Sequence, residues 1–199
     1  NEVGGKISHL GDLANRLHLQ TPNGFAITTT AFFTFMSRNG LFELVKDGLE
    51  QWDGSDLGLH ELSDLVQTRI MDSPLPWRLV AQIDAMVDVL GVQSSKPLRL
   101  ALRSSGWGED GDSSFAGQYD TELNIPPARV VEAYKRVIAS TYSIEAWRYR
   151  MDRGYHESEV AMAVGCQLMV ESHVSGVLFT CTQDPGQSCE SMVVSAAWG

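Results

Sequence analysis

Apolar residues recur at helical spacing along the first half of the chain. A first helix is predicted just after Gly4-Gly5, with Lys6 in its first turn, because the apolar positions that follow lie three or four residues apart. Those positions are Ile7, Leu10, Leu13, Ala14 and Leu17. Residues 41–92 predict three more helices, since turn-forming residues at 53–56 and 73–76 interrupt the same pattern. Residues 1–95 are therefore expected to be mainly helical.

A short strand is predicted between the first two helices. Residues 25–30 are mostly β-branched or aromatic, which favours a strand that ends at Thr30. Thr30 is then expected to cap a helix that ends at Asn39-Gly40. The phenylalanines of this helix are expected in the hydrophobic core: Phe32, Phe33 and Phe35.

Strand patterns dominate residues 96–199. Alternating leucines at 98, 100 and 102 predict a strand with Arg103 at its end, and a second strand-like run reaches Ile125. Residues 160–170 are nearly all apolar, which is typical of a strand buried on both faces. A turn at 171–176 and two more strands at 177–182 and 192–198 follow. The chain is thus predicted to be an α+β protein, with a mixed or antiparallel sheet under a helical cover.

Two cations stand beside glycine and hydroxyl groups that suit a bound anion. Arg103 precedes Ser104, Ser105 and a loop rich in glycine and acid at 106–112, where backbone amides and hydroxyls could donate to phosphate oxygens. Lys6 follows two glycines at a helix N-terminus, which also favours anions. Both residues have a plainer interpretation. In that interpretation, which composition alone favours for Arg103, Arg103 pairs with Glu109 or Asp110 across a surface hairpin and Lys6 is solvated.

Charge and cysteine content exclude several classes of protein. The 199 residues carry a formal net charge of −10, so nucleic acid is not expected as a partner, and no apolar run approaches the ~18 residues of a membrane span. Three cysteines without C-x-x-C spacing favour free thiols and a cytoplasmic protein. The chain begins with Asn1 and shows no secretory leader, so it is expected to be part of a longer protein.

Two further charged stretches are not expected to carry chemistry. Asp110-Gly-Asp112 lacks the other ligands of a calcium loop, so no metal site is predicted in this chain. The arginines of the predicted helix 144–153 alternate with acids, which predicts a solvated face of ion pairs. These arginines are Arg148, Arg150 and Arg153.

Taken together, the chain resembles the N-terminal nucleotide-binding region of the phosphoenolpyruvate synthase family, whose relatives include pyruvate phosphate dikinase and rifampin phosphotransferase. The matching segments occur in the family's order and span almost the whole chain. They are Val3–Lys6, Pro22–Thr29, Leu102–Ser105, Gly108–Asp110, Ser114–Gln118, Asp120-Thr121, Glu159–Met162, Gln167–Val170, Val174–Thr180 and Ala197–Gly199. The Ser-Phe-Ala-Gly-Gln form of residues 114–118 is similar to the synthase and rifampin-phosphotransferase branch rather than to the dikinases.

The resemblance implies an ATP-grasp fold that is incomplete at the C-terminal end, with ATP between two α+β lobes. It implies that Lys6 and Arg103 contact the ATP phosphates, with Ser104, Ser105 and Thr121 nearby. Residues Gln167, Met169 and Val170 match the strand that meets adenine, with Met169 against the ring and backbone groups reading its edge.

The implied reaction is that of a synthase. Mg-ATP phosphorylates an enzyme histidine, leaving AMP and phosphate, and pyruvate then takes the phosphoryl group. The Mg²⁺ ligands, the phosphohistidine domain and the pyruvate-binding domain are expected outside this chain, and none of its five histidines stands in the family's phosphoacceptor context. The chain alone is expected to be inactive. Two alternatives stay open: a regulatory module that binds nucleotide without chemistry, and a phosphotransferase with another acceptor, such as an antibiotic or a glucan.

Overall fold

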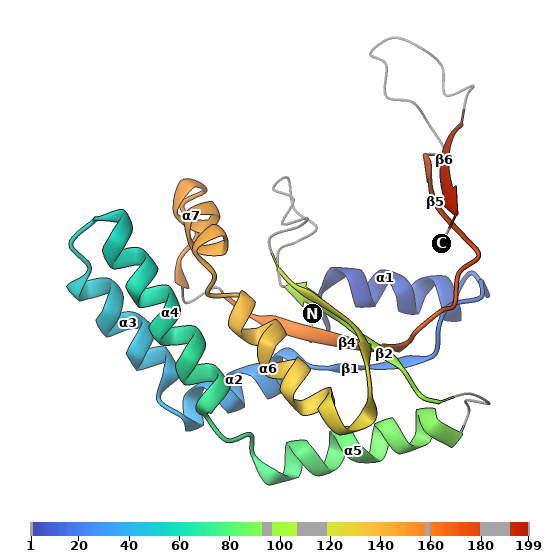
Figure 1. Ribbon diagram of the computed structural model, residues 1–199, viewed down its shortest axis with the longest axis horizontal. Helices are drawn as coiled ribbons and strands as arrows, with labels where there is room; N and C mark the ends of the chain where they lie inside the picture. The colour runs from blue at the N-terminus through green and yellow to red at the C-terminus, as the bar shows by residue number, and fades with distance from the viewer. Residues whose placement is uncertain (1, 93–96, 107–118, 158–159, 180–191, 199) are drawn as a thin grey trace. The chain divides into compact units, whose positions relative to one another are not determined.

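A computed structural model of the chain describes residues 2–92, 97–106, 119–157, 160–179 and 192–198 (Figure 1). The chain divides into two compact units, Asn1–Met169 and Val170–Gly199. In the described residues, helices and antiparallel strands combine into the predicted α+β class. No helix among these residues is long and apolar enough to cross a membrane.

Among the described residues, five of the seven α-helices of the first unit lie before residue 93. The three helices expected between residues 41 and 92 are confirmed, and Ser55 caps the second of them by accepting a hydrogen bond from the Gly58 amide. The elements in this part of the chain are α1 (Gly4–Asn15), β1 (Gly24–Ile27), α2 (Thr29–Arg38), α3 (Leu41–Gln51), α4 (Asp56–Asp72) and α5 (Trp77–Val92).

The rest of the first unit supplies the remaining strands of the sheet and two helices. Pro127 begins a short 3₁₀ turn that leads directly into a helix. The elements are β2 (Leu100–Gly106), β3 (Thr121–Ile125), the turn Pro127–Arg129, α6 (Val130–Ser140), α7 (Ile144–Asp152) and β4 (Met162–Leu168).

Within the described residues, β1, β4, β2 and β3 form one sheet in that order, and every pair is antiparallel. β4 is central, which explains why the apolar run at 160–170 is buried from Met162 to Cys166. The two faces of the sheet carry different helices. On one face, Ile7 of α1 packs on Gly165 of β4. On the other face, Arg136 of α6 forms an ion pair with Glu122 of β3, which is paired across the sheet with the core residue Leu102.

Two predictions about strand ends are wrong. β1 ends at Ile27 rather than Thr30, because Thr28 takes the extended conformation of an N-cap residue and α2 begins at Thr29. β2 continues to Gly106, so Arg103 lies in the middle of the strand rather than at its end. The strand can continue because β4 offers paired partners as far as Met162.

Two predictions about side-chain burial also fail in part. Phe32 and Phe35 are fully buried, but Phe33 is 42% exposed because it lies beside the stripe that α2 turns to the core. Arg150 is buried rather than solvated, because its guanidinium donates to the Glu157 carboxylate and to the Thr141 carbonyl. Arg148 is half exposed and pairs with Asp56, as a solvated ion pair would.

The second unit contains a two-stranded antiparallel hairpin among its described residues. β5 (Val174–Phe179) pairs with β6 (Val193–Trp198). The turn expected at 171–176 is wrong in its second half, because pairing with β6 already begins at Val174. Residues 180–182 of the predicted strand lie outside the described residues.

Candidate functional site

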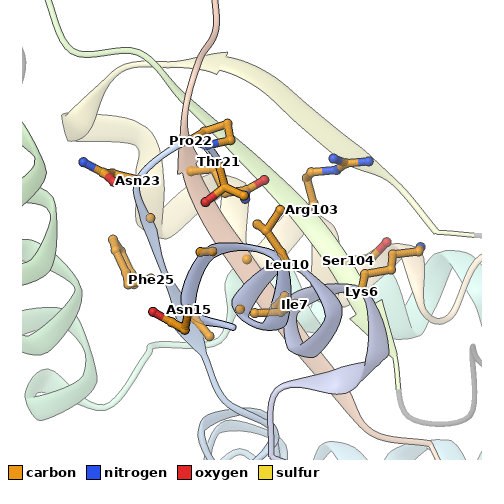
Figure 2. Close-up of a pocket in the computed structure, with 16 residues that line it drawn as sticks. Lys6, Ile7, Leu10, Asn15, Thr21, Pro22, Asn23, Phe25, Arg103 and Ser104 are labelled. Carbon is orange, nitrogen blue, oxygen red and sulfur yellow. The ribbon is translucent and has the colours of Figure 1, made fainter. Parts of the chain in front are cut away.

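A pocket of ≈ 370 Å³ lies in the first unit, between α1 and the sheet (Figure 2). Its walls come from α1, from residues 21–23 before β1, and from β1, β2 and β4. Four of the predicted site residues line it, although they are far apart in sequence. These residues are Lys6, Arg103, Ser104 and Gln167.

Three residues of the pocket lining, Ala26, Gly165 and Arg103, belong to a row of paired residues that crosses the sheet. Ala26, Gly165, Arg103 and Thr121 stand side by side on β1, β4, β2 and β3, because directly paired residues of antiparallel strands share one face. Ala26 and Gly165 are small, so the sheet leaves room beneath α1 at this point. Arg103 is the exposed member of an otherwise buried strand, which fits a side chain that projects into open space.

Lys6 reaches the pocket because the start of α1 is held close to β2. Gly4 has φ +68°, which a residue with a side chain rarely adopts, and a Cβ there would lie 2.2 Å from the carbonyl oxygen of Ser105. One turn later, Ile7 packs on Gly165, where an added Cβ would lie 3.1 Å from Cγ1 of Ile7. In Figure 2, Lys6 extends from α1 and Arg103 from β2, while Asn23 and Phe25 lie on the other side of the view.

The electrostatic character of this pocket differs from that of the whole chain. The chain has a net charge of −10, yet among the described residues that line the pocket the charged ones are Lys6 and Arg103, and none is acidic. The Arg103 side chain has no hydrogen-bond or ion-pair partner within the described part of the chain. Its alternative partners Glu109 and Asp110 lie outside that part. The pocket therefore presents positive charge, which attracts an anion.

The other predicted site residues take different places. Ser105 is fully buried, and its hydroxyl accepts a hydrogen bond of 3.4 Å from the Ile7 amide, so it faces the first turn of α1. Thr121 is exposed and pairs with Arg103. Gln167 lines the pocket near the end of β4.

The segment predicted to meet adenine leaves the sheet after Leu168, the last residue of β4. The Leu168 amide donates to the Asn23 carbonyl at 2.9 Å, and the Met169 amide donates to the Arg99 carbonyl at 2.9 Å. These two amides are therefore occupied within the first unit. Val170 is the first residue of the second unit.

Several pocket residues received no role from the sequence. Leu10, Pro22 and Phe25 form an apolar side of the pocket. Pro22 and Phe25 belong to a segment that resembles the family. A proline in a turn and a phenylalanine in a strand are equally common away from any pocket, so the sequence did not identify them as lining residues. Cys166, on the opposite face of β4, is fully buried, and burial raises the pKa of its thiol to about 12. It is therefore not a nucleophile at neutral pH.

In the described ranges, no group of three or more His, Cys, Asp or Glu side chains is arranged to hold a metal ion. Asp110 and Asp112 lie outside those ranges, as do residues 114–118 of the family-like segment. The pocket as described thus offers cations, amides and hydroxyls rather than metal ligands.

Comparison with known proteins agrees with the resemblance. Phosphoenolpyruvate synthase of Neisseria meningitidis serogroup B is 35% identical over 206 residues, covering 99% of this chain and 26% of that protein. The synthases of Helicobacter pylori and Escherichia coli K12 are 32% and 33% identical, each covering 100% of this chain and 26% of the relative. The chain thus spans about a quarter of the length of these relatives. A family model for the pyruvate phosphate dikinase AMP/ATP-binding domain matches residues 1–199, and the chain belongs to that family.

Proposed function

We propose that this chain is the ATP-binding part of a phosphotransferase that resembles phosphoenolpyruvate synthase. Mg-ATP would bind in the pocket under α1, with its phosphates on Lys6 and Arg103. The observation that carries the proposal is that Lys6 and Arg103 line the same pocket in a chain of net charge −10. The family's AMP/ATP-binding description supports the same ligand.

Lys6 and Arg103 would act by electrostatics and position. ATP carries about four negative charges, and phosphoryl transfer depends mainly on holding the reacting groups in line and offsetting the charge on the phosphate oxygens. A guanidinium can bind two phosphate oxygens in a fixed plane, whereas an ammonium adapts to one. Arg103 would therefore orient the phosphate chain and Lys6 would neutralise it, with the Thr121 hydroxyl, on the same face of the sheet, as a further donor.

The finer parts of the proposal concern the complete protein. An ATP-grasp fold would place adenine along Gln167, Met169 and Val170, with a second lobe over the nucleotide. ATP, water and an enzyme histidine would give phosphohistidine, AMP and phosphate, and pyruvate would take the phosphoryl group from the histidine. Mg²⁺ would arrive with ATP, its protein ligands lying outside the described residues. A cytoplasmic location fits this chemistry.

Calorimetry of Mg-ATP binding to the complete protein tests the proposal. Lys6→Ala and Arg103→Ala should each weaken binding tenfold or more, a loss of about 1.4 kcal/mol. Lys46→Ala and Arg69→Ala are the controls, because they remove the same charges from exposed positions on α3 and α4. Binding that is absent from the folded protein, or equally tight without either cation, would refute the pocket.

The reaction needs its own measurement. With Mg-ATP and pyruvate, the complete protein should release AMP and phosphate and form phosphoenolpyruvate. AMP release that does not depend on pyruvate would indicate another acceptor. Tight ATP binding without AMP release would indicate a regulatory module.

A further inference from the structure

We infer that Gly4 and Ser105 form a seat that positions Lys6 over the sheet, and that Ser105 acts through Lys6 rather than by touching the nucleotide. This inference rests on the proposed function, because the consequence of the seat is read out as ATP affinity. It changes the role of Ser105 from a phosphate ligand to a positioning residue.

Burial is the first reason for this assignment. Ser105 is 0% exposed, whereas Arg103, two residues earlier on the same strand face, is exposed. The difference arises because the start of α1 covers Ser105 but not Arg103. The pocket lining includes Arg103 and Ser104 but not Ser105.

The contacts at the start of α1 are the second reason. The N-cap residue of α1, Val3, makes no side-chain capping hydrogen bond. Contacts with residues outside α1 therefore fix the position of the helix start. Ser105 provides these contacts, since its hydroxyl accepts the Ile7 amide at 3.4 Å and its carbonyl and hydroxyl oxygens leave no space for a Cβ on Gly4. Because this hydrogen bond is long, we expect the close approach of Gly4 to Ser105 to contribute more to the position of the helix start.

Lys6 lies between two residues of α1 that contact the sheet. Gly4 rests on Ser105, and Ile7 rests on Gly165, the strand partner of Arg103. These two contacts therefore fix the distance between the Lys6 backbone and the sheet residues that lie beside Arg103. Displacement of the helix start would move the Lys6 ammonium away from Arg103 without changing either charge.

A double-mutant cycle with Lys6 tests this inference, with Mg-ATP affinity of the complete protein as the readout. Gly4→Ala should weaken binding about tenfold, comparable to losing Lys6, and Ser105→Ala about threefold, the lower part of the range for one hydrogen bond because this bond is long. In a Lys6→Ala background, both changes should have less than about a twofold further effect, since the group they position is gone. Additive losses in both backgrounds, or unchanged affinity of Gly4→Ala, would overturn the inference.

Matched controls separate the seat from general destabilisation. Gly40 has φ +64°, close to that of Gly4, but an added Cβ there meets no atom within 4 Å, so Gly40→Ala carries the backbone strain alone. Ser63→Ala removes another buried serine, whose hydroxyl donates to the Tyr142 carbonyl away from the pocket. Both controls should keep wild-type affinity, and a loss equal to that of the seat variants would overturn the inference. Failure of Lys6→Ala to weaken binding would instead count against the proposed function.

Discussion

Replacing Arg150 by methionine should destabilise the first unit strongly, because this arginine is a buried cation with a full set of partners. Its Nε and Nη2 donate to the two carboxylate oxygens of Glu157 at 2.8 and 3.1 Å, and its Nη1 donates to the Thr141 carbonyl at 2.6 Å. The guanidinium also lies 5.8 Å from the centre of the Tyr142 ring. Arg150→Met fills most of the same volume and removes every one of these bonds.

The expected loss follows from what the substitution leaves behind. Removing one partner of a buried ion pair costs about 3–5 kcal/mol, because the other charge stays buried without compensation. The Glu157 side chain is 21% exposed, so its carboxylate regains some water, and the loss should lie near the lower end, at about 3 kcal/mol. Arg148→Met is the matched control on the same helix. Its ion pair with Asp56 is 47% and 83% exposed, so its loss should be below about 0.5 kcal/mol.

Urea unfolding at pH 7, followed by circular dichroism, measures these losses. With a slope of about 2 kcal/mol per molar urea, Arg150→Met should lower the midpoint by about 1.5 M. The double variant Arg150→Met/Glu157→Leu should recover part of the loss, because it leaves no buried charge unpaired. A loss below about 1 kcal/mol, or one no larger than that of Arg148→Met, would refute the burial argument.

Two further predictions concern pKa values. Burial raises the pKa of Cys166 from 9.0 to about 12, so alkylation at pH 8 should label this thiol only after unfolding, as mass spectrometry of its peptide would show; equal rates in native and unfolded protein would contradict this. The neutral thiol favours the folded state fully below pH 9, and this contribution is lost as pH rises toward 12. Hydrogen bonding from Arg129 lowers the pKa of Glu132 from 4.5 to about 2, so an NMR titration should find this carboxylate ionised at pH 3, and Arg129→Ala should raise its pKa. The contribution of this carboxylate to the stability of the fold is present above pH 4.5 and is lost as pH falls toward 2. An unchanged Glu132 pKa in Arg129→Ala would contradict the assigned cause.

The helices were predictable from the sequence because each buries one stripe of its surface. Between residues 41 and 92 the apolar period and the turn residues mark three helices, and all three form. Strand ends were less predictable, since an alternating pattern does not show how far a neighbouring strand continues. β2 extends through Ser104 and Ser105 because β4 pairs with them and α1 covers Ser105, and both causes are tertiary.

Arg150 shows the same limit for side chains. Its neighbours in sequence suggested ion pairs along a helix surface, where partners stand three or four residues apart. The actual partner, Glu157, follows seven residues later, beyond the end of α7, and the chain must fold back to bring it there. Local spacing cannot reveal a pair of this kind.

The candidate site depends both on local sequence and on tertiary contacts. Lys6 and Arg103 are distant in sequence, and no local pattern predicts that β4 and β2 lie side by side beneath α1, so their proximity was predictable only through resemblance to a family. Whether they bind phosphate stays a prediction. The structure adds a physical reason for it, because the described lining of the pocket is cationic although the chain as a whole is acidic. Net charge argues against a large polyanion, which must approach the whole surface, but a small anion senses mainly the few charges around its own pocket. An acidic protein can therefore bind a nucleotide at one positive site, provided that the backbone holds its two cations on the same face. In this chain the close contact between Gly4 and Ser105 supplies that condition.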